Sequence, residues 1–202
     1  MVKTITVEWL QSKGACEESI KAWHGETDHD TFATLNRLVV KNPEWGHWLI
    51  CRIMNKNQSV QYAIFAAEQV IDIYEGKYPN DKRPRNAIEA AKAYVQNPSK
   101  KTKAYAADAA DAAYAAAYTT DASYAACAAD AAAYAAYAAA YADDAADATT
   151  YTTYATYAAY ADAAAAAAYA AAAAAYAAYA AYKRRKMKAK ILKYGIGLLE
   201  QS

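Results

Sequence analysis

The chain has 202 residues, which suits one domain, or one domain with an extension, and its formal net charge is +1. The near-neutral total hides a strong segregation, because residues 104–182 contain eight aspartates and no lysine or arginine, whereas residues 183–193 contain seven bases. This composition argues against a general nucleic-acid binder, and blocks of charge indicate a partner surface or compensation between segments.

The cysteines and the N-terminal residues bear on the cellular compartment. Cys16, Cys51 and Cys127 are scattered without a C-x-x-C pair, which argues against a disulfide framework and for a reducing environment. The first residues, MVKTITVEWL, lack the apolar core of a signal peptide, and aspartate or tyrosine repeatedly interrupts the long alanine tract, so no membrane span is expected. A cytoplasmic protein is therefore predicted.

Helix breakers divide the chain into two regions, 1–98 and 99–202, because glycine and proline are frequent up to Pro98 and absent from there to Gly195. In the first region, caps and apolar spacing predict short helices. Their expected ranges are 7–13, 17–24, a helix through 39 capped by Thr27, Asp28 or Asp30, a helix from Pro43 through Ile53, one continuous helix over 58–75, and 84–95.

The second region is predicted to form long helices, because alanine has the highest helix propensity. A single helix from Lys100 to Tyr194 would be roughly 140 Å long. Helical hairpins are expected instead, with breaks at 119–121 and 143–144 and a break or bend open at 147–150, since threonine and aspartate compete for backbone hydrogen bonds. The predicted fold is all-α: a multi-helix bundle of short helices followed by alanine- and tyrosine-rich hairpins, as one structural unit.

The basic segment 183–193 allows three interpretations. It can be the charged end of the last helix, stopped by Gly195, or a contact for a protein or nucleic-acid partner, or a membrane-surface segment. The first is favoured by position, and the bases could also offset the acidic tract across a pair of helices.

Tyrosines recur at helical spacing in the alanine tract, as at Tyr134, Tyr137 and Tyr141, so each helix should present an aromatic stripe while alanine permits close packing elsewhere. Tyrosine is enriched at binding hot spots, and aspartate complements a basic target. Same-helix hydrogen bonds are expected for Asp111/Tyr114, Asp121/Tyr124, Asp130/Tyr134 and Asp147/Tyr151. The predicted partner-binding residues are Tyr134, Tyr137, Tyr141, Tyr151, Tyr154, Asp143, Asp144 and Asp147.

No catalytic residue is predicted. The segment WHGETDHD (23–30) gathers histidines and carboxylates, but it lacks an established ligand spacing, so an interhelical loop is favoured and no metal or cofactor is expected. None of the three cysteines is expected to have a neighbouring histidine that could activate it as a nucleophile. No nucleophile motif or phosphate-binding glycine loop occurs in the sequence. An ice-binding threonine face at Thr149, Thr152, Thr153 and Thr156 is disfavoured, because tyrosines interrupt it.

The segment SVQYAIFAAEQVIDIYEGKYPNDKRPRNAIEAAKAYVQNP (59–98), followed by an alanine-rich run with repeated aromatics, resembles the alanine-rich immunity protein family found near bacterial toxin systems and in some phages. The resemblance rests on A-E-x-x-V and on D-x-R-P-R-x-A-I-E-A, and this chain departs from it in its tyrosine excess and basic tail. It implies a non-enzymatic protein that neutralises a toxin or a host defence effector by protein contact. The matching residues include Glu68, Asp81, Arg83, Pro84, Arg85 and Glu89.

The signature also has a local physical interpretation. Pro84 in the first turn fixes the start of a helix, and a carboxylate at Asp81 suits the helix N-terminus. Arg83 and Arg85 are expected to pair with Asp81, Glu68 or Glu89 and thereby to connect two helices, which is a structural role.

Two other functions stay open beside protein binding. Segregated charge could serve a DNA mimic or another nucleic-acid-related binder, and a pocket among the tyrosines could sequester a small molecule or nucleotide.

Overall fold

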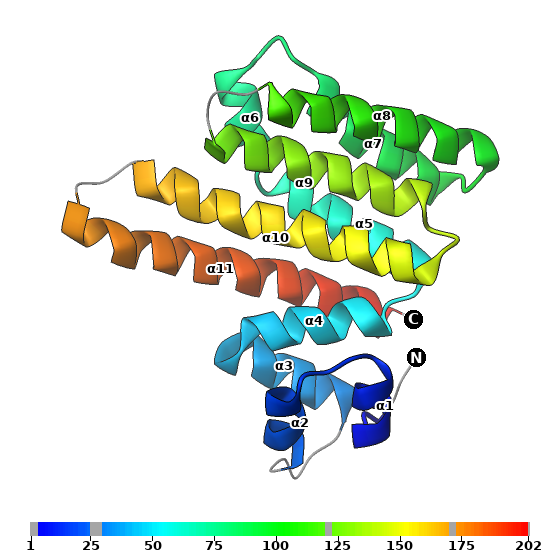
Figure 1. Ribbon diagram of the computed structural model, residues 1–202, viewed down its shortest axis with the longest axis vertical. Coiled ribbons are helices and arrows are strands. Elements are labelled where there is room, and N and C mark those ends of the chain that lie inside the picture. The colour runs from blue at the N-terminus through cyan, green and yellow to red at the C-terminus, as the bar shows by residue number, and fades with distance from the viewer. Residues whose placement is uncertain (1–3, 25–29, 120–122, 170–172, 202) are drawn as a thin grey trace.

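The computed structural model describes residues 4–24, 30–119, 123–169 and 173–201, and these residues form eleven helices and no strand (Figure 1). The all-α prediction is confirmed. An isolated bridge joins Thr4 to Asp30. The helices are α1 (Val7–Ser12), α2 (Glu17–His24), α3 (Thr31–Lys41), α4 (Pro43–Ile53), α5 (Lys56–Glu68), α6 (Ile71–Lys77), α7 (Arg83–Gln96), α8 (Lys100–Tyr118), α9 (Ser123–Ala140), α10 (Ala145–Tyr169) and α11 (Ala173–Glu200).

The four long helices α8 to α11 lie side by side in chain order, and each runs antiparallel to the one before it (Figure 1). α7 packs against α8 and α9, and α5 packs against α9, α10 and α11. α3 and α4 pack beside α11, and α1 packs on α2. One continuous core contains buried residues from both sides of Pro98, so the boundary at that residue is one of composition and not of packing.

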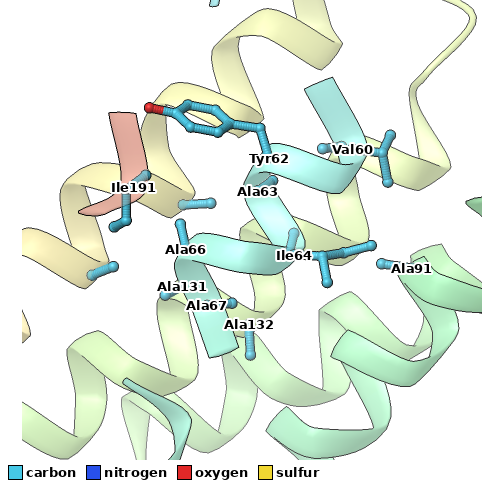
Figure 2. Packing of buried hydrophobic residues seen from close by; sticks show 14 of the residues in the cluster. Val60, Tyr62, Ala63, Ile64, Ala66, Ala67, Ala91, Ala131, Ala132 and Ile191 are labelled. Carbon is cyan, nitrogen blue, oxygen red and sulfur yellow. The ribbon is translucent and has the colours of Figure 1, made fainter. Parts of the chain in front are cut away.

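The central helix is α9, which contacts α5, α6, α7, α8 and α10. So many neighbours fit around one helix because its inward positions are alanine, whose small side chain lets backbones approach closely. Ala131 and Ala132 of α9 lie beside Ala66 and Ala67 of α5 where the two helices meet (Figure 2). All four are fully buried.

The predicted hairpin breaks agree with the observed helix ends. α8 ends at Tyr118, and residues 141–144 separate α9 from α10, as expected for segments rich in threonine and aspartate. The break or bend considered at 147–150 is not formed, because these residues lie inside α10. The carboxylate of Asp147 is favourable in the first turn of this helix. α10 ends at Tyr169 and α11 begins at Ala173, a division that the alanines around it do not indicate.

The continuous helix predicted over 58–75 is wrong, because α5 ends at Glu68 and α6 begins at Ile71. The side-chain amide of Gln69 donates to the backbone carbonyl of Phe65 at 2.9 Å and satisfies one of the last carbonyls of α5. The turn at Val70 then places Val70 and Ile71 in the core, with exposures of 0% and 1%, and directs α6 onto α9. A straight helix would not make that contact.

The prediction that Gly195 stops the last helix is also wrong, because α11 continues to Glu200. The basic segment therefore lies within α11 and beside α3 and α4. Lys188 Nζ is 2.6 Å from Glu44 Oε1, and Arg185 donates to the carbonyl of Val40 at 3.3 Å. These contacts join α11 to α3 and α4, and they do not neutralise the aspartates of residues 104–182.

Candidate functional site

The aromatic stripe of α9 is the part of this helix that remains partly exposed beside its buried alanines. Asp130, Tyr134, Tyr137 and Tyr141 follow each other at intervals of four, three and four residues, which places them on one side of the helix and just past its end. Since most of the other positions from 125 to 140 are buried against neighbouring helices, this stripe holds the large side chains that the described part of α9 presents to solvent.

Tyrosines from the two neighbouring helices extend the stripe sideways. On α10, the Tyr151 ring stacks on Tyr137 and Tyr141 with centroid separations of 5.2 and 5.4 Å, and Tyr154 lies 5.3 Å from Tyr134. All five predicted tyrosines therefore meet in one array. On α8, Tyr114 lies 6.4 Å from Tyr134 and 4.8 Å from Tyr118. We call the set the tyrosine face: Tyr114, Tyr118, Tyr134, Tyr137, Tyr141, Tyr151 and Tyr154.

The three predicted aspartates lie at one end of the tyrosine face and are all exposed. Asp143 forms an ion pair with Lys103. Asp144 caps α10 by accepting a hydrogen bond from the Asp147 amide at 3.2 Å. Burial is the main reason that the pKa of Tyr151 is raised, and the charge of Asp147 contributes to it. Asp147 is thus the predicted carboxylate most directly associated with the aromatic array.

The predicted hydrogen bond between Asp111 and Tyr114 within α8 is not formed, and Asp111 instead contacts a tyrosine of another helix. The Tyr137 hydroxyl donates to Asp111 of α8, and burial together with this bond raises the pKa of Tyr137 well above its usual value. Tyr114 bonds instead to the hydroxyl of Tyr118, with 2.8 Å between their oxygens. The pair Asp121/Tyr124 lies outside the residues whose side chains are described. Asp111 is therefore a member of the site that spacing along one helix does not identify.

Asp130 is a second carboxylate of the site that was not among the predicted binding residues. Its environment is unfavourable for the ionised form of the side chain. Its Oδ1 is buried without a hydrogen-bond partner, and the predicted bond to Tyr134 is not formed. Burial raises the pKa of Asp130 to about 6. A partly desolvated carboxylate without a partner costs folding free energy whenever it is ionised.

We therefore expect Asp130→Asn to stabilise the protein at pH 7 by about 1–2 kcal/mol, a value discounted for partial exposure. Because the folded-state pKa lies above the unfolded value of 3.8, the cost is present above pH 6 and is lost as the pH falls to about 4. Urea denaturation of both proteins at pH 7 and pH 4 measures the difference. Asp108→Asn, at an exposed position of α8, is the control, and an equal gain at both pH values would contradict the assignment.

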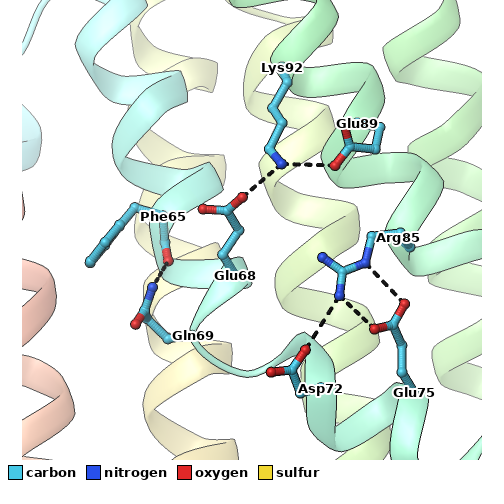
Figure 3. A network of polar contacts seen from close by, with 8 residues as sticks. All are labelled: Phe65, Glu68, Gln69, Asp72, Glu75, Arg85, Glu89 and Lys92. Atoms are coloured by element: carbon cyan, nitrogen blue, oxygen red, sulfur yellow. Dashed lines mark hydrogen bonds and ion pairs between the residues drawn. The ribbon is translucent and has the colours of Figure 1, made fainter.

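The family-like signature forms links between α7 and the helices before it (Figure 3). Arg85 of α7 donates to both carboxylate oxygens of Glu75 on α6, at 3.0 and 2.5 Å, and lies 3.4 Å from Asp72. Glu68 and Glu89, the partners expected for the arginines, instead bind Lys92, each at 2.8 Å. The turn at Val70 explains the difference, because it places α6 beside the start of α7.

The other half of the signature is as predicted. Arg83 lies 2.7 Å from Asp81, which also accepts the Tyr74 hydroxyl at 2.7 Å, and Pro84 occupies the first turn of α7. The hydrogen bonds from Arg83 hold the pKa of Asp81 far below its usual value. The contacts that these signature residues make are structural.

Because Arg85 joins two helices, Arg85→Ala is expected to lower the free energy of unfolding by about 1–2 kcal/mol. Lys77→Ala removes an exposed base of α6 and serves as the control, with a change within about 0.5 kcal/mol. Thermal and urea denaturation measure both. If the stability of the Arg85→Ala variant were unchanged, the structural role assigned to Arg85 would be wrong.

The interpretation that no cysteine has a histidine beside it is wrong. His47 and Cys51, one helical turn apart on α4, are both buried, with Cys51 Sγ 3.7 Å from His47 Nδ1. Burial raises the pKa of Cys51 to about 12 and lowers that of His47 to about 3. Both groups are therefore neutral at pH 7, which is not the state of an activated thiolate.

The same histidine accounts for two threonines considered for ice binding. Thr156 Oγ1 is 2.6 Å from His47 Nε2 and donates to the carbonyl of Thr153, so the imidazole Nε2–H donates to Thr156. Thr152 donates to the carbonyl of Ser59 at 3.2 Å. Thr152 and Thr156 are fully buried, and the ice-binding interpretation is overturned.

Among the residues that the structure describes, no group of three histidines, cysteines or acids is placed to hold a metal, and residues 25–29 of the histidine-rich segment lie outside them. No described helix is both long and apolar enough to cross a bilayer. Comparisons with protein-family models, curated proteins and solved structures find no match to the chain. The resemblance to immunity proteins stays a prediction.

Proposed function

We propose that the protein is a non-enzymatic cytoplasmic inhibitor of the immunity or phage anti-defence type. It neutralises a basic toxin or host defence effector by covering part of its surface with the tyrosine face. The observation that carries the proposal is the continuous array of partly exposed tyrosines across α8, α9 and α10, on a segment without lysine or arginine between residues 104 and 182.

The chemistry of the array suits protein recognition. Tyrosine offers a large rigid ring and a hydroxyl at little cost in side-chain entropy, and such residues dominate binding energy at interface centres. The rings stand on alanine helices that pack closely, so the face is preorganised and little ordering is required on binding. Tyr118, Tyr141 and Tyr154 are 75%, 43% and 48% exposed, and therefore retain area that a partner can bury.

The charge of the face supports a basic partner. Asp111 and Asp147 are exposed beside the tyrosines. The charge of Asp130 contributes to the raised pKa values of Tyr114 and Tyr134. The unpaired Asp130 carboxylate lowers stability in the free protein. An arginine or lysine of a partner would neutralise it, which turns a cost of the free state into binding energy.

The test is capture of a partner from host lysate by the tagged protein, followed by calorimetry with the purified pair. The Tyr141→Ala, Tyr154→Ala double variant should bind at least about tenfold more weakly. Tyr182→Ala, which removes a ring of similar exposure (52%) from α11, should bind normally. Affinity should fall between 50 and 300 mM salt.

Two results would refute the proposal. A partner that binds both variants equally would place the interface elsewhere on the molecule. A partner that is acidic, or that binds without salt dependence, would show that the aspartates are not the recognised charge. Displacement of the partner by double-stranded DNA would instead favour the DNA-mimic alternative.

A further inference from the structure

A groove of about 530 Å³ lies between α11 and the corner where α3 ends and α4 begins. Its described lining residues come from 40–44 on one side and from 180–188 of α11 on the other, and none of them belongs to the tyrosine face. The first half of α11 extends past this corner (Figure 1). The volume of the groove is within the range of about 300–1,000 Å³ that is usual for small-molecule sites.

The inner face of α11 changes from apolar to basic where it reaches the groove. From Ile191 to Leu199 this face packs in the core. At helical intervals before Ile191, the same face carries Lys188, Arg184 and Ala181, and all three line the groove. Charged side chains are rarely buried against apolar residues, so this part of the face is suited to an anion and not to the core.

The balance of charge in the groove is positive. Its described lining residues include one carboxylate, Glu44, and four bases, Lys41, Arg184, Arg185 and Lys188. Glu44 Oε1 lies 2.6 Å from Lys188 Nζ. The hydrogen bond and charge of Lys188 are the main reason that the pKa of Glu44 is lowered, and the charge of Arg184 contributes less. Lys188 therefore offsets the single negative charge of the groove.

The other three bases form no ion pair with any residue that the structure describes. Arg185 donates to the carbonyl of Val40 at 3.3 Å, and this neutral acceptor leaves the charge of the guanidinium uncompensated. Arg184 is exposed and is attracted only weakly to Glu44, which Lys188 already holds. Lys41 is exposed at the end of α3. Three positive charges that share one groove repel each other, and an anion bound among them would relieve the repulsion.

Phosphate groups fit these bases better than carboxylates. A phosphate monoester carries about 1.5 to 2 negative charges at pH 7 and several acceptor oxygens, whereas a carboxylate carries one charge. Guanidinium groups bind phosphate through paired hydrogen bonds, and lysine adds a point charge. Lys41 reaches the groove from α3, and Arg184 and Arg185 reach it from α11. Two adjoining phosphate groups would supply enough charge for all three bases.

We propose that this groove binds a small molecule that carries a diphosphate group, held by Lys41, Arg184 and Arg185. The site goes beyond the proposed function, and binding of a basic partner to the tyrosine face does not depend on it.

The probe is sodium pyrophosphate, titrated into the full chain by isothermal calorimetry at pH 7 in metal-free buffer. We expect one saturable site that binds pyrophosphate at least about tenfold more tightly than orthophosphate at equal ionic strength. The affinity should fall between about 50 and 300 mM salt. ADP should compete for the site, and AMP should compete at least about tenfold less well. ADP that binds more tightly than pyrophosphate would identify the diphosphate as part of a nucleotide, and equal binding would show that the diphosphate alone is recognised.

Matched variants locate the site. The Arg184→Gln, Arg185→Gln double variant should bind pyrophosphate at least about tenfold more weakly, and Lys41→Gln, on the other side of the groove, at least about threefold more weakly. The control is the Lys190→Gln, Lys193→Gln double variant, which removes the same charge from exposed positions of α11 outside the groove. Its affinity should stay within about twofold of the native protein. Circular dichroism of each variant should be unchanged, because the substituted side chains form no ion pair with a described residue.

Three results would overturn the proposal. The first is that pyrophosphate shows no saturable binding, or binds no better than orthophosphate. The second is that both double variants weaken it equally, which would mean general attraction to a basic surface. The third is that a labelled single-stranded oligonucleotide displaces pyrophosphate and is itself weakened equally by both double variants, since an extended polyanion would contact bases inside and outside the groove.

Discussion

Replacing Gly195 by leucine is expected to destabilise the protein by about 3 kcal/mol or more. Gly195 lies inside α11, five residues before its end, where a Cβ atom would come within 2.6 Å of Ile50 Cδ1 and 2.7 Å of Tyr62 Cε2. Ile50 and Tyr62 are fully buried, so neither can move aside without disturbing the core. The larger leucine side chain would separate α11 from α4 and α5.

Gly197 provides a matched control in the same helix. Nothing lies within 4 Å of the position that its Cβ would occupy. Gly197→Ala should therefore stabilise the protein by about 0.5–1 kcal/mol, the usual gain from replacing a helical glycine. Urea denaturation followed by circular dichroism measures both variants. If Gly195→Leu were as stable as the native protein, α11 would not pack as closely as the structure shows.

The local features of the fold could be predicted because each depends on a few neighbouring residues. Asp30 caps α3 by accepting the Ala33 amide at 2.8 Å, and Pro43 begins α4. The breaks before α9 and α10 follow from threonine and aspartate in an alanine chain. The tyrosine face could be anticipated for a similar reason, since helical spacing alone places the rings of α9 on one side.

The features that could not be predicted depend on residues distant in the chain. A glycine near the end of a helical pattern signals either a stop or a close approach, and the buried side chain of Tyr62, more than a hundred residues before Gly195, decides which. The sequence around Arg85 contains several carboxylates that could pair with it. It pairs with Glu75 because the turn at Val70 places α6 near the start of α7. Asp111 joined the tyrosine face through Tyr137 of a different helix.

The second large effect is expected at His47, which should make the free energy of unfolding fall as the pH decreases. Its ring bonds to Tyr62 at 3.2 Å and to Thr156 at 2.6 Å in the core, and burial lowers its pKa from 6.5 to about 3. Between these values the unfolded chain binds more protons than the folded protein. The stability contributed by neutral His47 is therefore complete above pH 6.5 and falls by about 1.4 kcal/mol for each pH unit below it.

Asp130 opposes this loss in the native protein. Its folded-state pKa of about 6 lies above the unfolded value of 3.8, so the folded protein binds the additional proton and stability rises as the pH falls between them. The Asp130→Asn variant removes the compensation and isolates His47. The carboxylates whose pKa values are lowered by basic partners, such as Glu44 and Glu75, lose stability only below about pH 4.5, outside the range needed.

In the Asp130→Asn background, we expect the free energy of unfolding to fall by about 2 kcal/mol between pH 6.5 and pH 5. Adding His47→Gln should remove most of this slope, because the amide does not titrate yet can donate to Thr156 and accept from Tyr62. Urea denaturation across the range measures both variants. Equal slopes would mean that His47 is hydrated in solution, and a hydrated imidazole would be incompatible with the sealed contact of α4, α5 and α10 on which the position of the tyrosine-bearing helices depends.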